Sequence, residues 1–518
     1  MSWISILFVV IILFLLTLYL YFSKNVNYWK IRNIPYVEPF PFLGNLKDVL
    51  LQKVDIGHHL KNIHDKFKGT PYVGIFFFDQ PALLIRDLDL VKNILVKDSY
   101  EYFMDRIMNM DEKVDPMGGK NMFSLKGEKW RFMRSKMTPT FTSVKMKNML
   151  HLVQHCGEEL VTCIDRLSTE AGGSVHVKDL TARYTTDVIA SCAFGIESNS
   201  LRDPEAEFRR ILRSIFQFSP RKALAGFTSF FAPKLQRIFK LRLINEEVTN
   251  FVRNTLWRTM EYREKNGTTR KDFIDSIMQI VRKNGIQESG FTYIESQGHK
   301  LKIDGDDFVA QAYIFLAAGF EPASTTMSFA LYELSFRPDI QNQMREEITT
   351  VLNKFNNDID YNALQEMTYL DMVVSETLRK YPVVPFVDRV ASKDYIITSS
   401  DEKNLLLAAG TSVYISVLGI HNDPEYYTEP NVFDPLRFTE ENKNQRPHYA
   451  YLPFGEGPRT CIGARFGLMG VKIGLIHILL NYEVSPCENT PTSLTFDTKP
   501  FLLATEGEIP LHFKRIRK

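Results

Sequence analysis

The sequence has almost no excess of either charge and very little cysteine. Against 61 Asp and Glu residues stand 63 Lys and Arg residues, which leaves a formal net charge of +2. Nucleic-acid-binding domains usually carry a strong basic excess, so no nucleic-acid partner is predicted. Five cysteines in 518 residues, without any CxxC spacing, are typical of free thiols in a reducing compartment rather than of a disulfide framework. A glycine-rich dinucleotide motif is also missing, so NADPH is not predicted to bind this chain directly.

Charged side chains are also absent from residues 3–22, WISILFVVIILFLLTLYLYF, a length that spans a bilayer as a helix. The run is longer than the apolar core of a signal peptide and has no small-residue cleavage site. Because it is apolar on every face, a membrane span is favoured over the core helix of a globular protein. Lys24, Lys30 and Arg32 follow the run and no basic residue precedes it, so the positive-inside rule places the remainder on the cytoplasmic side.

We therefore predict a transmembrane signal anchor at residues 1–22 and a proline-rich linker at residues 23–45. Proline fixes φ and favours extended chain, so the linker should act as a stiff strap between membrane and body. With 44% hydrophobic and 12% aromatic residues, the rest of the chain can bury a large core. We predict that residues 46–518 form one catalytic domain, mainly α with small β-sheets.

Several local expectations follow from the residue patterns of that domain. Residues 73–85 are predicted to form two strands around a turn, and residues 88–379 to be mostly helical. The charged segment 262–272, YREKNGTTRKD, is predicted to be an exposed loop. Further expected elements are a long helix through the core at residues 304–337, a last helix at about 464–480 and a C-terminal hairpin.

The segment 454–463 reads FGEGPRTCIG and has the features that a metal-binding thiolate needs. Its glycines and proline make a tight loop in which backbone N–H groups can approach a sulfur atom. Arg459 places a cation two residues before Cys461. Gly463 then admits a helix whose N-terminal dipole favours the anionic sulfur. The alternative is a buried cysteine in a Gly-Pro loop, which is the usual fate of a lone cysteine.

The same segment resembles the haem-binding signature of the cytochrome P-450 superfamily, F-x-x-G-x-R-x-C-x-G, at every fixed position. The resemblance covers essentially the whole chain and implies the cytochrome P-450 fold with haem b, iron protoporphyrin IX, as cofactor. It implies that Cys461 ligates the haem iron and that Phe454 packs beside the sulfur. Arg459 is implied to pair with a haem propionate.

Further family motifs occur in the same order along the chain. Glu376 and Arg379, in SETLR, stand at i and i+3 on one helix face and can pair. An isolated pair of this kind is usually an ordinary surface ion pair. In the family, such residues form a buried triad with an arginine at the position of Arg437, in FDPLRF, and fix the loop under the haem.

Two more motifs concern the propionates of the haem. Trp130 and Arg134, in WRFMR, lie one helical turn apart and resemble the pair that binds a propionate in the family. Arg106 and Arg389 fall where further propionate contacts are often found. The alternative for each of these residues is an ordinary place in the core or on the surface.

The sequence departs from the family pattern in the long helix. Residues 318–326 read AGFEPASTT, so that Pro322 stands where the family has a threonine that helps to deliver protons at the haem. Proline has no hydroxyl and no N–H, and it kinks a helix. Ser324, Thr325 or a bound water could substitute, with Glu321 as the carboxylate of the relay. Back-bonding to helix carbonyls is the competing interpretation of Ser324 and Thr325.

The resemblance also implies a function and partners. Segments such as YWKIRNIPY, TPTFTSVKMKNM and TTDVIASCAFGIESNSL resemble insect microsomal families related to vertebrate drug-metabolising enzymes. The expected reaction is a monooxygenation of lipophilic small molecules, for example plant toxins or insecticides. NADPH-cytochrome P-450 reductase would supply the electrons, with cytochrome b5 as a further possible partner. The expected location is the endoplasmic reticulum membrane, with the catalytic domain on the cytoplasmic face.

Apolar segments suggest where substrate and membrane meet the protein. Phe315, Phe320 and residues 383–386 fall where the family lines its substrate pocket, and residues 227–240 combine aromatic and basic side chains as a membrane-resting surface does. Each of these aromatics could instead belong to the core. Two other functions stay open from the sequence: peroxide-dependent oxidation or isomerisation on the same fold, and a non-catalytic haem protein that binds a hydrophobic ligand.

Overall fold

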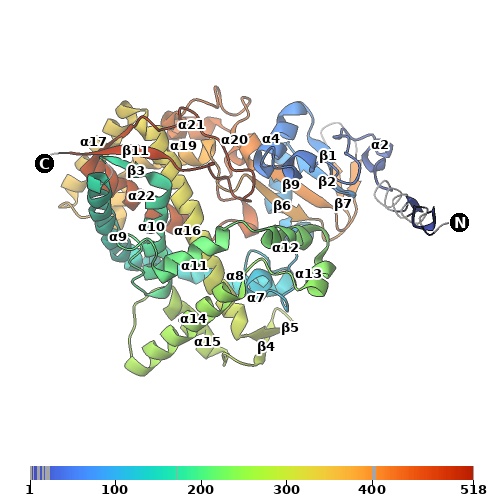
Figure 1. Ribbon diagram of the computed structural model, residues 1–518, viewed down its shortest axis with the longest axis horizontal. Coiled ribbons are helices and arrows are strands. Elements are labelled where there is room, and N and C mark those ends of the chain that lie inside the picture. Colours follow the sequence, from blue (N-terminus) through green and yellow to red (C-terminus); the bar gives the residue numbers. More distant parts are fainter. Residues whose placement is uncertain are drawn as a thin grey trace.

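The computed structural model describes residues 24–170, 172–398 and 404–516 and, near the N-terminus, residues 3, 5–8, 12, 13 and 17. The signal anchor predicted for residues 1–22 therefore lies largely outside the described residues. Within the described part, the chain is mainly helical with small β-sheets, as predicted. Helices fill one side of the molecule in Figure 1, and most of the strands lie towards the N-terminal side.

Helix α16 (Gly305–Ser335) runs through the middle of the molecule, which confirms the long helix expected there. It begins with a capping box: the Asp304 side chain accepts from the backbone N–H of Asp307, and the Asp307 side chain accepts from the backbone N–H of Asp304. Most of its residues are buried on all sides, as its apolar sequence requires. It packs closely against α10 (Val177–Ile189), where the Thr181 hydroxyl lies 3.1 Å from the carbonyl oxygen of Ser324.

The other helices surround α16 or connect to it. Helix α22 (Ala464–Asn481) confirms the last helix expected from the sequence. The remaining α-helices are α2 (Tyr28–Ile31), α3 (Lys47–Leu50), α4 (Ile56–Lys66), α5 (Leu88–Lys92), α6 (Ser99–Tyr102), α7 (Pro116–Lys120), α8 (Gly127–Met137), α9 (Ser143–Glu170), α11 (Glu207–Phe216), α12 (Pro220–Phe231), α13 (Pro233–Phe239), α14 (Glu246–Asn266), α15 (Phe273–Lys283), α17 (Pro338–Lys354), α18 (Tyr361–Glu366), α19 (Thr368–Lys380), α20 (Val417–His421) and α21 (Glu440–Gln445). Short 3-10 or π segments are η1 (Asn93–Lys97), η2 (Thr138–Phe141), η3 (Ala190–Phe194), η4 (Pro435–Phe438), η5 (His448–Ala450) and η6 (Gly457–Arg459).

The largest sheet has the order β1-β2-β9-β6 and consists of β1 (Tyr72–Phe77), β2 (Gln80–Ile85), β9 (Ser412–Ser416) and β6 (Phe386–Val390). Strands β1 and β2 form the antiparallel pair expected at residues 73–85. A three-stranded sheet joins β10 (Tyr482–Pro486), β11 (Pro510–Arg515) and β3 (Ser174–His176). Strands β10 and β11 are antiparallel, as in the predicted C-terminal hairpin, but residues 487–509 connect them in place of a short turn. Two further pairs are β4 (Phe291–Ser296) with β5 (His299–Asp304), and β7 (Tyr395–Thr398) with β8 (Asn404–Leu407).

The charged segment 262–272 is the predicted exposed loop only at residues 267–271. Helix α14 continues to Asn266, and Arg263 is buried with only 3% of its surface exposed. The Arg263 guanidinium pairs with the carboxylates of Asp272 and Asp275, each at 2.5 Å. Two carboxylates compensate the buried cation, so Arg263 ties α14 to α15 below a loop whose other side chains are exposed.

The segment predicted as a linker packs against the first sheet. Trp29 is fully buried, and its indole N–H donates to the carbonyl of Ile75 in β1 at 3.1 Å. Tyr36 and Gly44 form isolated bridges to residues of the same strand. The domain division at residues 22 and 45 remains a prediction.

Helix α22 is, among the described residues, the one helix with the length and composition of a membrane span, at a mean hydropathy of 1.3. However, 61% of that stretch is buried inside the protein, beside α9 and α16. A core helix of a folded domain passes the same test of length and composition.

Candidate functional site

The loop that carries Cys461 is held in one conformation by its own backbone. The Cys461 N–H donates to the carbonyl of Phe454 at 2.9 Å and closes the loop before α22 begins. Gly457 has a positive φ of 74°, and a β-carbon there would overlap the carbonyl oxygen of Leu95 in η1. The loop therefore requires glycine at this position, because both its φ and the approach of η1 exclude a side chain.

The Cys461 side chain faces an internal space. Its surface is exposed, yet burial among surrounding protein atoms raises the pKa of its thiol. Both hold for a sulfur that borders a deep recess within the protein. The backbone N–H of Gly463 lowers the pKa of the Cys461 thiol in turn. Arg134 and Arg106 act in the same direction, so the site favours a thiolate more than burial alone would.

The middle of α16 borders the same region. Ala318 is exposed although its helical neighbours Ala317 and Phe320 are buried. One turn earlier, the Phe315 ring packs edge-on against Phe141 at 5.0 Å between centroids. A β-carbon on Gly463 would lie 3.7 Å from that same Phe141 ring, so one phenylalanine touches both α16 and the residue two after Cys461.

Four arginines form a cluster at this site: Arg106 and Arg134 lie near Cys461, and Arg389 and Arg459 lie near Arg106. Arg459 is buried and donates to the carbonyls of Met104, Met122 and Leu125 at 2.8, 3.2 and 2.7 Å. Its guanidinium also lies 4.1 Å from the centre of the Trp130 ring. The sequence predicted that Arg459 pairs with a propionate. In the structure, each nitrogen of its guanidinium group already donates to a backbone carbonyl.

The other arginines of the cluster are less well compensated. Arg389 is 2% exposed, and its Nε has no hydrogen-bond acceptor among the described residues. Burial lowers the pKa of Arg389, and the neighbouring Arg106 lowers it further. Arg106 pairs with Asp388 at 3.2 Å, but its Nε likewise has no acceptor in the described chain. Burial also lowers the pKa of Arg134.

The cluster, two of whose arginines are buried and two partly buried, has more positive charge than the nearby carboxylates neutralise. Four guanidinium groups face two nearby carboxylates, those of Asp105 and Asp388. Unpaired buried cations are costly, so a ligand with carboxylate groups is expected to complete the cluster. A cysteine sulfur, an internal space and surplus arginines together fit a haem group with its two propionates.

Three polar residues of α16 were predicted to form a proton relay. Burial raises the pKa of the Glu321 carboxyl, against the smaller effects of Lys178 and Arg209. The Ser324 hydroxyl donates to the carbonyl of Glu321 at 2.9 Å, which is the back-bonding alternative foreseen for it. Thr325 is buried, and within the described part of the chain its hydroxyl forms no hydrogen bond.

Pro322 lies inside α16 and leaves the helix continuous. Because proline has no N–H, the carbonyl of Ala318 loses its partner four residues on. That carbonyl lies at the exposed stretch of the helix and can accept a hydrogen bond from a water or a bound molecule.

Comparison with known proteins identifies the family. The chain matches the cytochrome P450 family over residues 34–512. It is 49% identical to cytochrome P450 6j1 of Blattella germanica over 514 residues, which is 99% of this chain and 98% of that protein. It is 43% identical to cytochrome P450 6k1 of the same organism, covering 96% and 94% of the two chains. It is 42% identical to probable cytochrome P450 6a14 of Drosophila melanogaster, covering 95% and 96%.

The chain belongs to the cytochrome P450 family. It is an oxidoreductase of the monooxygenase class whose cofactor is haem. The resemblance stated from the sequence is thereby confirmed, and the likeness to insect members extends over the full length of the chain. The non-catalytic alternative does not agree with this membership.

The ion pair of α19 in this cytochrome P450 is fully buried. Arg379 donates to both carboxylate oxygens of Glu376 at 2.7 and 2.8 Å, and also to the carbonyls of His421 and Pro430. Arg437 lies 3.6 Å from Glu376, so the triad expected from the sequence is assembled. Its donors hold the irregular chain around residue 430, well before the Cys461 loop.

Asp388 is a site residue that the sequence reasoning missed. Its carboxylate accepts from Arg106 and, at 2.7 Å, from the backbone N–H of Ile107. It is 4% exposed and stands in β6 next to Arg389. An adjacent acid and base within an otherwise apolar strand was the available signal, because a buried charge usually has a buried partner.

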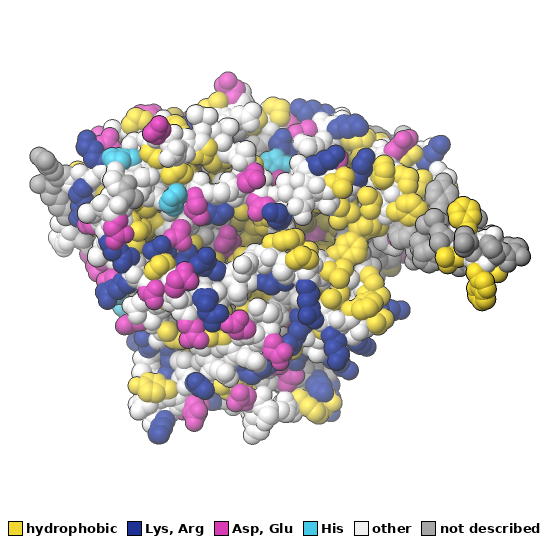
Figure 2. Space-filling view, in the orientation of Figure 1, with side chains coloured by type: hydrophobic (Ala, Val, Ile, Leu, Met, Phe, Trp, Pro, Cys, Tyr) yellow, Lys and Arg dark blue, Asp and Glu magenta, His cyan; other side chains and the backbone are white. Residues whose placement is uncertain are grey.

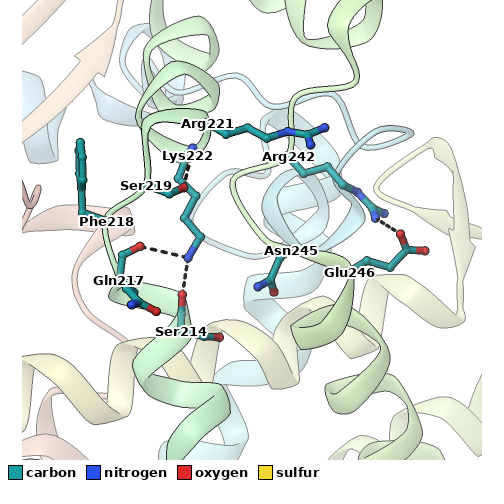
Figure 3. A pocket seen from close by; sticks show the side chains of 9 residues that line it. All are labelled: Ser214, Gln217, Phe218, Ser219, Arg221, Lys222, Arg242, Asn245 and Glu246. Carbon is teal, nitrogen blue, oxygen red and sulfur yellow. Dashed lines mark hydrogen bonds and ion pairs between the residues drawn. The ribbon is translucent and has the colours of Figure 1, made fainter.

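A separate cavity of about 510 Å³ opens where α11, α12 and α14 meet, shown in Figure 3. Polar side chains line most of it, and Lys222 reaches the carbonyl of Ser214 at the end of α11. Arg242 pairs with Glu246 at 3.3 Å on the opposite wall. The lining includes no residue of the Cys461 loop or of α16, so this cavity is distinct from the region around Cys461.

Proposed function

We propose that this cytochrome P450 uses Cys461 as the axial ligand of haem b and inserts one oxygen atom from dioxygen into lipophilic small molecules. The carrying observation is the Cys461 sulfur, which borders an internal space in a loop that admits no side chain at Gly457. Haem held through a thiolate supplies the activation of dioxygen. Electrons are proposed to come from NADPH through NADPH-cytochrome P-450 reductase, with cytochrome b5 as a further donor.

The surrounding residues hold the cofactor and tune the sulfur. Arg106, Arg134 and Arg389 direct surplus positive charge at the haem site, where propionates accept charge-assisted hydrogen bonds. Trp130 stacks on Arg459 and completes that wall. We assign Arg459 mainly to positioning, because three backbone carbonyls occupy its nitrogens.

Groups on either side of Cys461 stabilise its thiolate and fix the loop. The N–H of Gly463 stabilises the anionic sulfur from the start of α22. Phe454 precedes the sulfur, accepts the N–H of Cys461 with its carbonyl, and packs partly buried against the core.

Proton delivery is proposed to run through Glu321 and Thr325 with bound water. The raised pKa of Glu321 makes its carboxyl a proton donor at higher pH than usual. Thr325 keeps a hydroxyl that the helix does not use, whereas the Ser324 hydroxyl binds a carbonyl of its own helix. The Ala318 carbonyl, freed by Pro322, gives the water an acceptor. Of the three predicted relay residues, Ser324 is thus the least suited to this role.

Lipophilic substrates, for example plant toxins or insecticides, are proposed from the apolar residues near this site and from the likeness to insect family members. Phe315 and Phe320 are buried in α16 on either side of Ala318. Phe320 contacts Phe216 of α11, and Phe315 contacts Phe273 of α15. Val383 and Phe386 are buried as well, in the stretch that leads into β6.

The endoplasmic reticulum membrane is the proposed location, with the N-terminal anchor in the bilayer. Of the predicted anchor, the described side chains Trp3, Phe8 and Leu13 are exposed apolar groups. Figure 2 shows hydrophobic side chains gathered on the side of the molecule that carries the N-terminus. Helices α12 and α13 add exposed apolar and basic residues within 227–240 and just before it: Leu224, Lys234, Leu235, Arg237, Ile238, Phe239 and Lys240. Such a mixture suits an interface with anionic lipid.

The experiment combines a spectrum with turnover. Reduced protein with carbon monoxide should show the red-shifted Soret band of thiolate-ligated haem, and Cys461→Ala should abolish it. The matched control is Cys192→Ala, because Cys192 is buried in the core away from the loop. Incubation with NADPH, reductase and lipophilic probes should give hydroxylated products. A normal band in Cys461→Ala would overturn the ligand assignment.

A second candidate, peroxide-dependent oxidation on the same site, is favoured by Pro322 alone. Pro322 stands where the family has a threonine, so the threonine hydroxyl is missing at this point of the helix. Product formation with added peroxide but without reductase and NADPH distinguishes it from the monooxygenase.

A further inference from the structure

Gln311 joins the central helix to the segment between α7 and α8. It lies in α16 and is fully buried. Its amide oxygen accepts from the backbone N–H of Met122 at 2.9 Å. Its amide nitrogen donates to the carbonyl of Lys120 at 2.8 Å and to that of Asp307 at 2.7 Å. Every partner is backbone, so this side chain fixes the position of a main-chain segment rather than pairing with another side chain.

The segment held by Gln311 has no regular secondary structure to support it. Between α7 and α8 its order comes from side chains such as Asn121. The Asn121 amide donates to the carbonyls of Met117 and Gly118 and accepts from the N–H groups of Phe123 and Ser124. Outside this local turn, Gln311 supplies the buried tie to α16. The other tie, Lys120 with Asp304, is partly exposed to solvent and is expected to contribute less.

The opposite side of the same segment holds Arg459. The carbonyls of Met122 and Leu125 accept from its guanidinium at 3.2 and 2.7 Å. Met122 therefore bonds to Gln311 through its N–H and to Arg459 through its carbonyl. Arg459 lies two residues before Cys461. The loop that carries both residues has little room to move, because Gly457 packs directly against η1.

We infer that Gln311 is a positioning residue that sets the spacing between α16 and the Cys461 loop. It stands seven residues before Ala318, two helical turns or about 10 Å along the same face. A shift of the 120–125 segment would move Arg459, and with it the sulfur, relative to the exposed stretch of α16. This inference rests on the proposed ligation by Cys461, which the carbon monoxide spectrum of the unaltered protein tests separately.

The chain offers a matched control in Gln341. This glutamine is also buried, accepts from the N–H of Val484 at 2.8 Å and donates to the carbonyls of Leu334 and Val484 at 3.2 and 2.9 Å. It ties α17 to β10, and its hydrogen bonds go to Leu334, Val484 and Arg345 rather than to the Cys461 loop. Gln311→Met and Gln341→Met both remove three hydrogen bonds to backbone at nearly constant volume, one set beside the site and one remote from it. Gln341→Met also removes a hydrogen bond from the Arg345 guanidinium at 3.1 Å, so it is the more severe change of the two.

The test compares both variants as haem-loaded, full-length proteins. Thermal stability should fall in both, and at least as much in Gln341→Met as in Gln311→Met. The thiolate-type carbon monoxide band should decay about tenfold faster in Gln311→Met and within about twofold of the unaltered rate in Gln341→Met. The haem reduction potential should shift in Gln311→Met alone. Equal behaviour of the two variants in decay and potential would assign Gln311 to the core and overturn the inference.

A second variant, Gln311→Glu, keeps the inference testable if Gln311→Met folds poorly. Gln311→Glu, which is neutral in this fully buried position, keeps the acceptor for Met122 and replaces the two N–H donors by one O–H donor, so its band should decay at an intermediate rate. If both Gln311 variants fail to fold while Gln341→Met folds, the role of Gln311 is stability alone and the inference fails. If the unaltered protein lacks the thiolate band, the proposed ligation fails instead.

Discussion

Arg379 and Glu376 bond to each other through two parallel hydrogen bonds, with neither side chain exposed to solvent. Burial raises the pKa of Glu376, and the Arg379 guanidinium opposes this effect. Since neither charge can reach water, each depends on the other and on the carbonyls that Arg379 binds.

Removal of either partner should therefore unfold the protein. We expect Glu376→Ala to lower the free energy of unfolding by about 3–5 kcal/mol, because it strands the buried Arg379 cation. Haem content and folded protein should fall together in denaturant titrations and absorbance spectra. Glu366→Ala is the surface control, since its ion pair with Lys354 is exposed. A stable, haem-loaded Glu376→Ala protein that is merely slower would contradict this account.

The arginine cluster predicts opposite effects on the two states of the protein. Arg389→Met removes a buried cation whose Nε has no acceptor among the described residues. The haem-free protein should become more stable by about 1–3 kcal/mol. Haem should dissociate about tenfold faster or more, because a charge-assisted contact is lost. Haem transfer to a scavenger protein and unfolding of the haem-free form measure both effects.

A control for this prediction is Arg345→Met. Arg345 donates to the carbonyls of Leu479 and Tyr482, remote from the cluster. Its loss should lower stability and leave the rate of haem dissociation unchanged. Stability that moves in the same direction in both variants would show that the cluster carries no surplus charge.

Glu321 predicts a dependence on pH with a definite sign. Its folded pKa is raised above the ordinary value of 4.5, so the folded state favours the neutral carboxyl. Stability should therefore fall as pH rises from about 4.5 through the folded pKa, where the unfolded chain releases the proton first. Glu321→Gln should remove this loss and be more stable than the unaltered protein at neutral pH. Unfolding measured from pH 5 to 8 tests the sign, and a steeper loss in the variant would refute it.

Pro322 predicts loose coupling of NADPH use to product. If Thr325 and water replace the missing hydroxyl only in part, much of the NADPH should appear as peroxide rather than product. General acid–base assistance is worth about 10²–10⁴-fold in rate, so Pro322→Thr should raise product per NADPH clearly. Product, peroxide and NADPH must be measured together in both proteins. Tight coupling in the unaltered protein would mean that Thr325 already suffices.

Deletion of residues 2–22 should release part of the protein from membranes and leave its haem content near normal. The remaining binding should depend on α12 and α13, since Ile238 and Phe239 are exposed there. Sedimentation with vesicles of anionic and neutral lipid measures both parts. Loss of all folded protein would place the segment in the core instead.

Motifs of adjacent residues were predicted well from the sequence. The Cys461 loop, the Glu376–Arg379 pair and the long apolar helix were all visible, because each is determined by residues that are close in sequence. Arg437 was added by resemblance and does lie beside Glu376.

Contacts between segments that are distant in sequence could not be predicted. Arg263 was expected in solvent because its neighbours are charged, and only the fold shows that α15 brings two carboxylates to it. In the same way, the carbonyls that hold Arg459 belong to irregular segments more than 300 residues away, and no residue pattern marks a carbonyl as an acceptor. The spare hydroxyl of Thr325 also required coordinates, because Ser324 beside it has the same chemistry in the sequence.

The surplus of arginine around the proposed haem site has a consequence for the amount of this protein in a cell. A newly made chain must either bind haem or keep mutually repelling cations together, so haem acts as a ligand of the native state and shifts the folding equilibrium by mass action. Chains made when haem is scarce should populate open forms more often and be degraded sooner. The amount of this enzyme should therefore follow the supply of haem as well as the level of its messenger.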